Sequence, residues 1–453
     1  MSESTHRSQA LLTTGNPARR IIVFALPILA ADFLHLFYTM TDAFIVGRWL
    51  GINGLAAVGA GTSPIHFILS FAIGLTAGFA VITTQRVGEG NEEGIRRSVA
   101  TGILLSLVSA LILTFLLIPL VPHILSAMRT PAEIIDDAGN YVMITCMGIF
   151  FFVFTNMFTG IIHAGGNSLT PFLFMIIATA CNIVLDILFI VVFSWGIKGA
   201  AAATVISEFS ACVLCTAYLL RRLKRFLPRR DDWRSFRKEA GAHLSLGIAM
   251  SLQRCIVEAG NILVQAAMNT MGAMTIAAVS AAQRIRGLNM TPFFALSRAM
   301  TTYTAQNYGA GKMDRVNRGI FHACLVSLVL GVFMAALNQF SGASIAALFL
   351  KDNSEAVALA RQYVLFTGYT VFLLGIMLVF RSSLQGLGMR RAPILCGVME
   401  TVMSVFAAFV LIPRFGFVGV CLVNPLSWLA SCVPLFIAFG IVRKKERGNG
   451  IRA

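Results

Sequence analysis

Long apolar stretches alternate with short polar breaks along the whole chain. The breaks hold turn residues or charge, as in GEGNEEGIRR (88–97) and GAGKMDR (309–315). Twelve apolar stretches follow this pattern, at residues 20–47, 55–85, 97–121, 136–163, 171–195, 199–222, 242–270, 277–305, 318–342, 356–384, 392–413 and 416–442. Each reaches the roughly 20 residues that a membrane-spanning helix needs, and several are long enough to tilt. The pattern therefore predicts twelve transmembrane helices, with both ends of the chain on the same side of the membrane.

The composition supports the same class of protein. Of the 453 residues, 57% are hydrophobic and only 12% are charged, about half the charged fraction of an ordinary soluble protein. All nine cysteines lie in apolar stretches, where we expect them to pack between helices. The first apolar stretch is too long and too acidic for a signal peptide, so no cleaved signal is expected. The chain is predicted to be an all-α polytopic membrane protein.

The net charge of +16 is explained by where the basic residues lie. Most of them follow even-numbered stretches or flank the first and last ones: Arg19, Arg20, Arg96, Arg97, the run from Arg221 to Lys238, Lys312, Arg315, Arg318, Arg390, Arg391, Arg443, Lys444 and Lys445. Basic loops stay on the cytoplasmic side of a membrane. Both termini are therefore predicted to be cytoplasmic, and nucleic acid is not expected as a partner.

The second half of the chain repeats the first. At an offset of 221 residues, LAAVGA (55–60) overlays IAAVSA (276–281), Gln85 meets Gln306 and Arg97 meets Arg318. At an offset of 220, GIKG (196–199) meets GFVG (416–419). Because each copy holds six spans, the copies share one orientation and are predicted to be related by a pseudo-two-fold axis along the membrane normal. Two such six-helix lobes suit a transporter that opens alternately to either side.

This repeat defines the predicted domains. A cytoplasmic tail (1–19) precedes an N-lobe (20–222), and a basic cytoplasmic linker (223–240) joins it to a C-lobe (241–442), which a basic tail (443–453) follows. The linker holds the only sizeable polar run between spans, and we expect it to lie at the anionic cytoplasmic face.

One stretch combines hydrophobicity with acids. PILAADFLHLFYTMTDAFIVG (27–47) carries Asp32, His35 and Asp42. A charge at membrane depth costs about 2.5–3.5 kcal/mol on insertion scales, so such a residue indicates a functional site. Pro27 lies fifteen residues before Asp42, about 22 Å along a helix, and a proline there bends the helix. An acid on a bending helix suits ion coupling.

The fifth stretch supplies a second acid. Asp186 follows Asn182 by four residues, which places both on one face of a helix. Thr204 and Tyr141 offer hydroxyl groups at similar depth, although ordinary packing would also explain them. If Asp42 and Asp186 share a pocket, they titrate as a coupled pair. Such a pocket could hold a proton, or a Na⁺ ion at Asp42, Asn182, Asp186 and Thr204, and the sequence leaves both alternatives open.

The second half does not copy this site. The residue 221 positions after Asp42 is Leu263. Glu258 follows Arg254 by four residues in the seventh stretch, so the two form either a structural ion pair or a substrate-facing C-lobe site. Coupling is therefore predicted to be asymmetric and centred on the first half.

These motifs resemble those of the multidrug and toxic compound extrusion (MATE) transporters. The resemblance rests on P-x14-D-x3-VG in the first span, on AQNYGAGKMDRV (305–316) with its weaker copy TQRVGEG (84–90), and on NxxxD in the fifth span. It covers nearly the whole chain and is greatest for the DinF-type branch.

The resemblance implies a multidrug efflux antiporter in the bacterial inner membrane that exports cationic or amphipathic organic compounds in exchange for H⁺ or Na⁺. It assigns the N-lobe ion network to Asp42, Tyr141, Asn156, Asn182, Asp186 and Thr204, with Pro27 at the bend. It also implies a functional monomer without a cofactor, whose partners are small-molecule drugs and the lipid bilayer.

Other function classes lack their motifs. No GxxxxGK[ST] loop for ATP-driven pumping occurs, and neither HExxH nor GxSxG, so the chain is not expected to be an enzyme. The alternative within transporters is a flippase for lipids or lipid-linked oligosaccharides of the same superfamily. Fourteen spans or a cationic central cavity would favour it, whereas twelve spans and the Asp42/Asp186 set do not.

Overall fold

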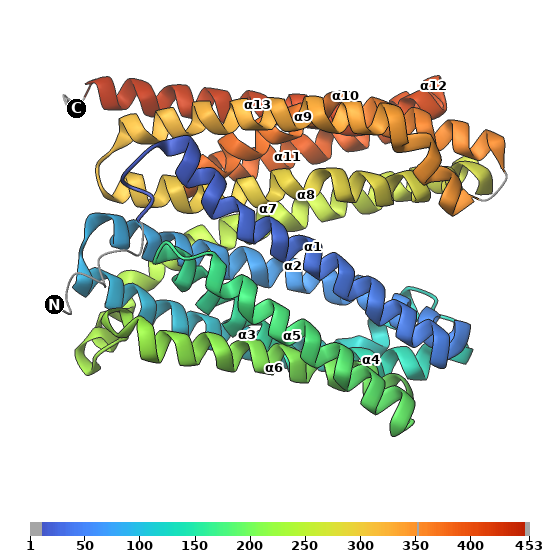
Figure 1. Ribbon diagram of the computed structural model, residues 1–453, viewed down its shortest axis with the longest axis horizontal. Helices are drawn as coiled ribbons and strands as arrows, with labels where there is room; N and C mark the ends of the chain where they lie inside the picture. The colour runs from blue at the N-terminus through green and yellow to red at the C-terminus, as the bar shows by residue number, and fades with distance from the viewer. Residues whose placement is uncertain (1–10, 351–352, 449–453) are drawn as a thin grey trace. The chain divides into compact units, whose positions relative to one another are not determined.

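The protein is all helical. The computed structural model describes residues 11–350 and 353–448, and these residues form helices and short connections with no β-strand. In the first half the elements are α1 (Pro17–Trp49), α2 (Gly51–Glu89), α3 (Glu92–Ala127), α4 (Ala132–Ala164), α5 (Leu169–Asp186), the π-helix η1 (Ile187–Val192) and α6 (Gly196–Arg222). In the second half they are α7 (Phe236–Met268), α8 (Ala273–Gly309), α9 (Met313–Leu350), α10 (Ser354–Gly386), α11 (Arg391–Phe406), the π-helix η5 (Ala407–Leu411), α12 (Ile412–Phe415) and α13 (Phe417–Gly448) (Figure 1). The predicted all-α class is confirmed.

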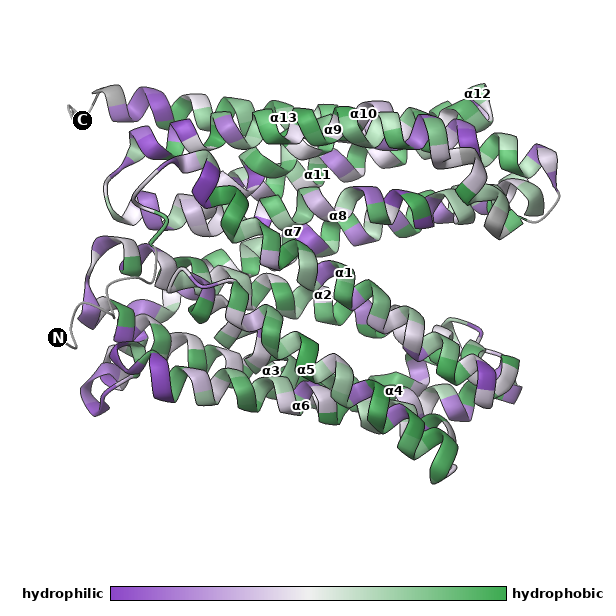
Figure 2. Ribbon diagram, viewed as in Figure 1, coloured by the Kyte–Doolittle hydropathy of each residue, from purple (hydrophilic) through white to green (hydrophobic). Residues whose placement is uncertain are grey.

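Ten helices of the described ranges are long and apolar enough to cross a membrane. The two other predicted spans correspond to α7 and α8, which have 33 and 37 residues but carry more polar side chains. Figure 2 shows hydrophobic residues along most of each long helix and many hydrophilic ones at helix ends. The molecule is therefore a multi-pass membrane protein.

Turn and capping residues set the helix ends. Gly90 and Gly311, one in each copy of the repeat, both have φ 69°, a left-handed conformation that glycine adopts without steric cost. The side chain of Asn91 caps α3 by accepting a hydrogen bond from Gly94 N at 2.8 Å. Asn353 caps α10 in the same way, accepting from Ala356 N at 3.0 Å. Gly90 and Gly311 thus follow the ends of α2 and α8, and the two asparagines begin α3 and α10, all within polar breaks between the predicted spans.

The internal repeat extends to helix geometry. α4 and α10 both have 33 residues and start 222 positions apart. The fifth helix of each copy changes from α to π at matching positions, into η1 after Asp186 and into η5 after Phe406. The two halves thus share details of backbone conformation as well as helix order.

The chain divides into two compact units. The first unit contains Leu26–Ser251, and the second contains Leu12–Ala25 together with the chain from Leu252 onward. The division therefore falls inside α1 and inside α7, whereas the predicted lobe boundaries lie at 222 and 241. The predicted linker contains two short 3₁₀ helices, η2 (Lys224–Phe226) and η3 (Arg230–Ser235), and the beginning of α7.

Within the first unit, the linker is held against α3 by an ion pair. Arg96 Nε lies 3.2 Å from Asp232 Oδ2, and both side chains are largely buried. Asp232 Oδ2 also accepts a hydrogen bond from Arg229 N at 2.8 Å. The linker is therefore a folded part of this unit.

The segment Leu12–Gly15, in the second unit, is bound by the motif at 305–316. Gln306 Oε1 accepts from Leu12 N at 2.8 Å, and Arg315 Nη1 donates to Gly15 O at 2.8 Å. Arg315 also donates to Leu12 O at 3.2 Å and to Asn307 Oδ1 at 3.0 Å. The polar residues of this motif thus fix the chain just before α1.

We expect Arg315→Gln to loosen this segment. The variant removes charge-assisted hydrogen bonds worth about 1.5–3 kcal/mol each, so local opening should rise at least about tenfold. Amide hydrogen exchange at Leu12 measures the change. Arg318→Gln, an exposed arginine on the same helix, is the control. Equal exchange rates in the two variants would contradict the role given to Arg315.

Candidate functional site

Side chains from four helices of the first unit form the candidate site. Asp42 comes from α1, Tyr141 from α4, Asn182 and Asp186 from α5, and Thr204 from α6. Asn182 and Asp186 are fully buried, and Asp42 is half-buried. The i, i+4 spacing on α5 places Asn182 and Asp186 on one face, directly before the chain widens into η1.

The two acids are neighbours. Asp42 and Asp186 lie close enough for their charges to interact. Ionised carboxylates only accept hydrogen bonds, so a hydrogen bond between the two requires that one of them carries a proton. The geometry therefore suits a pair that shares and releases one proton, or that holds a cation between its oxygens.

Several polar atoms of this cluster lack a hydrogen-bond partner among the described residues. They are Asp42 Oδ1, both side-chain polar atoms of Asn182 and both carboxyl oxygens of Asp186. A buried polar group without a partner costs about 1–3 kcal/mol, and more when charged. Such a group of oxygen atoms can accept a proton or bind a cation, because oxygen atoms are the ligands that hard cations prefer.

Two tyrosines border the acids. Tyr141 is within electrostatic range of both Asp42 and Asp186. Tyr38 is within range of Asp42, and its hydroxyl lies 3.5 Å from Thr204 Oγ1, at the outer limit of a hydrogen bond. Sequence reasoning missed Tyr38, although its position four residues before Asp42 places it on the same helix face. Tyr38 also stacks on His35, with ring centroids 5.7 Å apart.

Asn156 is not near Tyr141. Both residues are on α4, but fifteen positions separate them, about 22 Å along the helix. Asn156 Nδ2 donates to Phe152 O at 2.9 Å, one turn earlier on the same helix. Its membership of the ion network stays a prediction.

Pro27 lies inside α1, which continues through it from Pro17 to Trp49. The proline has no N–H to donate to the helix. The boundary between the two units lies between Ala25 and Leu26, directly before it. Pro27 thus sits where α1 passes from one unit to the other.

The second unit has no copy of the acid pair among its described residues. Leu263 occupies the repeat position of Asp42. Phe406 directly precedes η5 as Asp186 directly precedes η1, so Phe406 occupies the repeat position of Asp186. Arg254 and Glu258 are within electrostatic range, but no ion pair joins them in the part of the chain that the structure describes. Glu258 accepts from Asn261 Nδ2 at 3.4 Å, and Arg381 pairs with Glu400 at 3.8 Å.

Comparison with known proteins gives related sequences and a matching fold. The family model MatE matches the chain twice, at residues 27–188 and 249–410. A Bacillus subtilis protein named probable multidrug resistance protein YoeA is 26% identical over 447 residues, covering 95% of each chain. An FAD transporter of Shewanella oneidensis is 27% identical and covers 82% of each chain. A solved outward-facing multidrug resistance MATE transporter of the MOP superfamily has a TM-score of 0.89 at 22% identity, covering 97% of this chain and 99% of its own.

Proposed function

Since the chain belongs to the MatE family of membrane transporters, we propose that it is a secondary-active multidrug efflux antiporter. It exports cationic or amphipathic organic compounds by alternating access and takes up H⁺ or Na⁺ in exchange. The observation that carries this proposal is the buried group of polar atoms at Asp42, Asn182 and Asp186 that have no hydrogen-bond partner among the described residues.

The proposed coupling follows from this group. A proton or Na⁺ entering the cluster satisfies the carboxyl oxygens and removes the repulsion between Asp42 and Asp186. The occupied and empty clusters then favour different packings of α1 against α5, with Pro27 allowing α1 to bend. Tyr141 and Thr204 complete the polar surround, and Asn182 Oδ1 serves as a neutral oxygen ligand when the ion is Na⁺.

One coupling ion supplies enough energy. A charge moving through 100 mV releases about 2.3 kcal/mol, and about 1.4 kcal/mol corresponds to a tenfold concentration ratio. A single ion can therefore support a substrate gradient of roughly fifty-fold.

The transporter works in the bacterial inner membrane as a monomer, with both termini in the cytoplasm. The relative named as an FAD transporter belongs to the same wider group, so the cargo has to be tested directly.

A gradient experiment tests the proposal. Protein in liposomes is given either a pH gradient or a Na⁺ gradient, and a fluorescent cationic dye is followed in each. We expect one gradient to drive the dye against its own concentration gradient, because exchange couples the two flows. Liposomes without protein are the control. If neither gradient moves the dye, drug antiport is wrong and a lipid flippase becomes the better account.

A further inference from the structure

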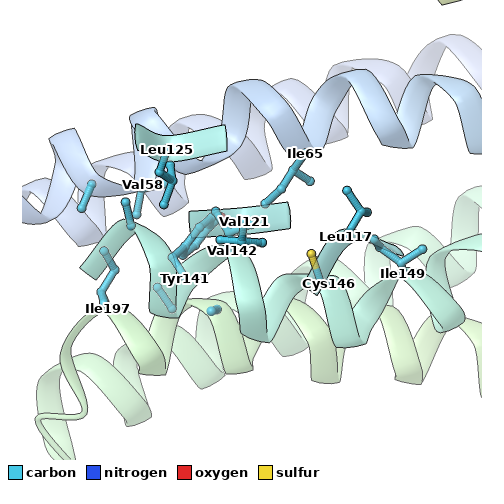
Figure 3. Close-up of a cluster of buried hydrophobic side chains, with 14 of the residues drawn as sticks. Val58, Ile65, Leu117, Val121, Leu125, Tyr141, Val142, Cys146, Ile149 and Ile197 are labelled. Carbon is cyan, nitrogen blue, oxygen red and sulfur yellow. The ribbon is translucent and has the colours of Figure 1, made fainter. Parts of the chain in front are cut away.

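Each unit has a small pocket, and the two pockets occupy matching positions in the repeat. In the first unit the pocket lies between α2, α3 and α4, and its lining is apolar: Ile65, Ile68, Leu117, Val121, Val142 and Cys146. Figure 3 shows most of these side chains within the surrounding core. In the second unit the lining comes from α8 and α10 and includes Arg286, Asn289, Val364, Thr367 and Gly368. The pocket of the second unit thus has polar residues where that of the first unit is apolar.

The internal repeat identifies which residues changed. An offset of 221 pairs Ile65 with Arg286, Ile68 with Asn289 and Leu117 with Asn338. The offset of 222 that relates α4 to α10 pairs Val142 with Val364 and Cys146 with Gly368. Three apolar side chains of the first unit therefore correspond to three hydrogen-bond donors in the second.

Asn338 on α9 lies beside two residues that line the second pocket, Asn289 and Gly368. Its Oδ1 accepts from Asn289 Nδ2 at 2.9 Å. Its Nδ2 lies so close to Gly368 that a Cβ at that position would be only 2.5 Å away. Gly368 thus leaves room for an amide donor where the first unit has Cys146.

Two hydrogen-bond donors at or beside this pocket are unsatisfied. Arg286 Nη1 donates to Asn424 Oδ1 at 2.9 Å, but Arg286 Nε is buried and has no acceptor among the described residues. Asn338 Nδ2 is also buried without an acceptor in those residues. Within the described chain no carboxylate forms an ion pair with Arg286. A guanidinium group at membrane depth is expensive unless a negative charge or a polar partner accompanies it.

The surroundings match those of the acid pair in the first unit. Asn424 donates to the Tyr363 hydroxyl at 2.9 Å, and these two residues take the repeat positions of Thr204 and Tyr141. The same scaffold positions therefore surround carboxylates in the first unit and an arginine in the second. Positive charge and unsatisfied donors favour a ligand that accepts hydrogen bonds and carries negative charge.

We propose that the pocket between α8 and α10 of the second unit binds a small anion through Arg286, which lines it, and Asn338, which lies beside it on α9. The pocket has a free volume of about 10 Å³, roughly the room that one water molecule needs. Sites for drug-sized ligands are far larger, so the ligand is one small ion such as a halide, or the single carboxylate end of a larger compound. The use of the site by cargo rests on the proposed export function, whereas the binding of an anion does not.

Thermal unfolding with chloride as the probe tests the binding. Purified protein in nanodiscs is titrated with sodium chloride, which replaces the sodium salt of HEPES so that sodium concentration and ionic strength stay constant. The HEPES anion is too bulky to enter this pocket. We expect a saturable rise in Tm for the wild type and for Arg443→Gln, which removes an exposed arginine at the far end of α13. In Arg286→Gln the half-maximal chloride concentration should rise at least about tenfold, as for loss of a hydrogen bond to a charged group. No saturable rise in the wild type, or the same midpoint in Arg286→Gln, overturns the proposal.

A second variant keeps the test decisive if Arg286→Gln does not fold. Asn338→Leu keeps the arginine and introduces the residue found at this position in the first unit. It removes one unmet donor, so its chloride midpoint should also rise. An unchanged midpoint in a folded Asn338→Leu protein overturns the role of that donor and with it the proposed site.

Transport of a matched pair of dyes identifies the source of the anion. A carboxylate-bearing rhodamine and its methyl ester are compared in liposomes. If Arg286→Gln reduces export of the acid about tenfold and leaves the ester unchanged, the carboxylate of the cargo occupies the site. If both dyes are exported normally while the chloride effect is lost, a free anion occupies it. If the wild type exports neither dye, the proposed export function fails, and the chloride titration still decides the anion site.

Discussion

Asp42→Asn is expected to abolish gradient-driven export while leaving the protein folded. An amide neither takes up nor releases a proton, and it lacks the charge that would pair with Na⁺. The loss should therefore reduce dye movement to the level of liposomes without protein. Asp42 Oδ1 is buried without a hydrogen-bond donor among the described residues, so replacing the carboxylate should not lower the Tm. The measurements are dye transport in liposomes and thermal unfolding of the same preparation.

A matched control separates this effect from a general loss of charge. Asp136→Asn removes an exposed acid near the start of α4, and its export should equal that of the wild type. Normal gradient-driven export by Asp42→Asn would contradict the proposed coupling through Asp42. A Tm lowered by several degrees would instead mean that Asp42 has a structural role that the geometry does not predict.

The second large effect is expected at Gly78, where α2 meets the first part of α7. A Cβ at Gly78 would lie 2.4 Å from Gly247 Cα and 2.5 Å from Gly247 N. These are backbone atoms, which cannot move aside as a flexible side chain can. Gly78→Ala should therefore force the two helices apart and cost about 1–3 kcal/mol or more. A Cβ at Gly74 would likewise lie 2.5 Å from Ser251 Cα, so the crossing depends on small residues at both positions.

The same helix supplies the control for this substitution. A Cβ at Gly59 would meet nothing within 4 Å. Gly59→Ala should leave the stability unchanged or raise it by about 0.5–1 kcal/mol, since alanine favours a helix more than glycine does. Thermal unfolding of the two variants under one set of conditions makes the comparison. Equal Tm values would show that α2 and α7 do not pack as closely as the structure places them.

Much of the fold can be predicted from local information in the sequence. A run of about 20 apolar residues has few alternatives to a spanning helix, because its backbone must be satisfied internally. The acids at Asp42 and Asp186 were also predictable, since the cost of burying a charge makes such residues exceptional wherever they occur. Their proximity in space was not, because it depends on how the helices that carry them are arranged.

Features that arise only from packing or from comparison of the two copies were harder to predict. In the sequence, Tyr38 cannot be distinguished from a tyrosine that only packs in the membrane. The structure shows that its hydroxyl lies near Thr204. Arg286 was not singled out, although the repeat pairs it with Ile65 and so signals a change of chemistry. The division of the chain inside α1 and α7 could not be predicted from hydropathy, because continuous helices show no break there.

The paired π-helical turns also carry information about the history of the chain. A π-helix is rare, and it is usually kept where a function uses its extra width. Here η1 directly follows the acid at Asp186, but η5 follows Phe406, which has no charge to position. Two copies of a rare backbone feature at one register imply that the single ancestral half already had it before duplication. The wide turn is therefore older than the difference in acidic residues between the two units. The second unit retains a backbone onto which an acid site could be engineered.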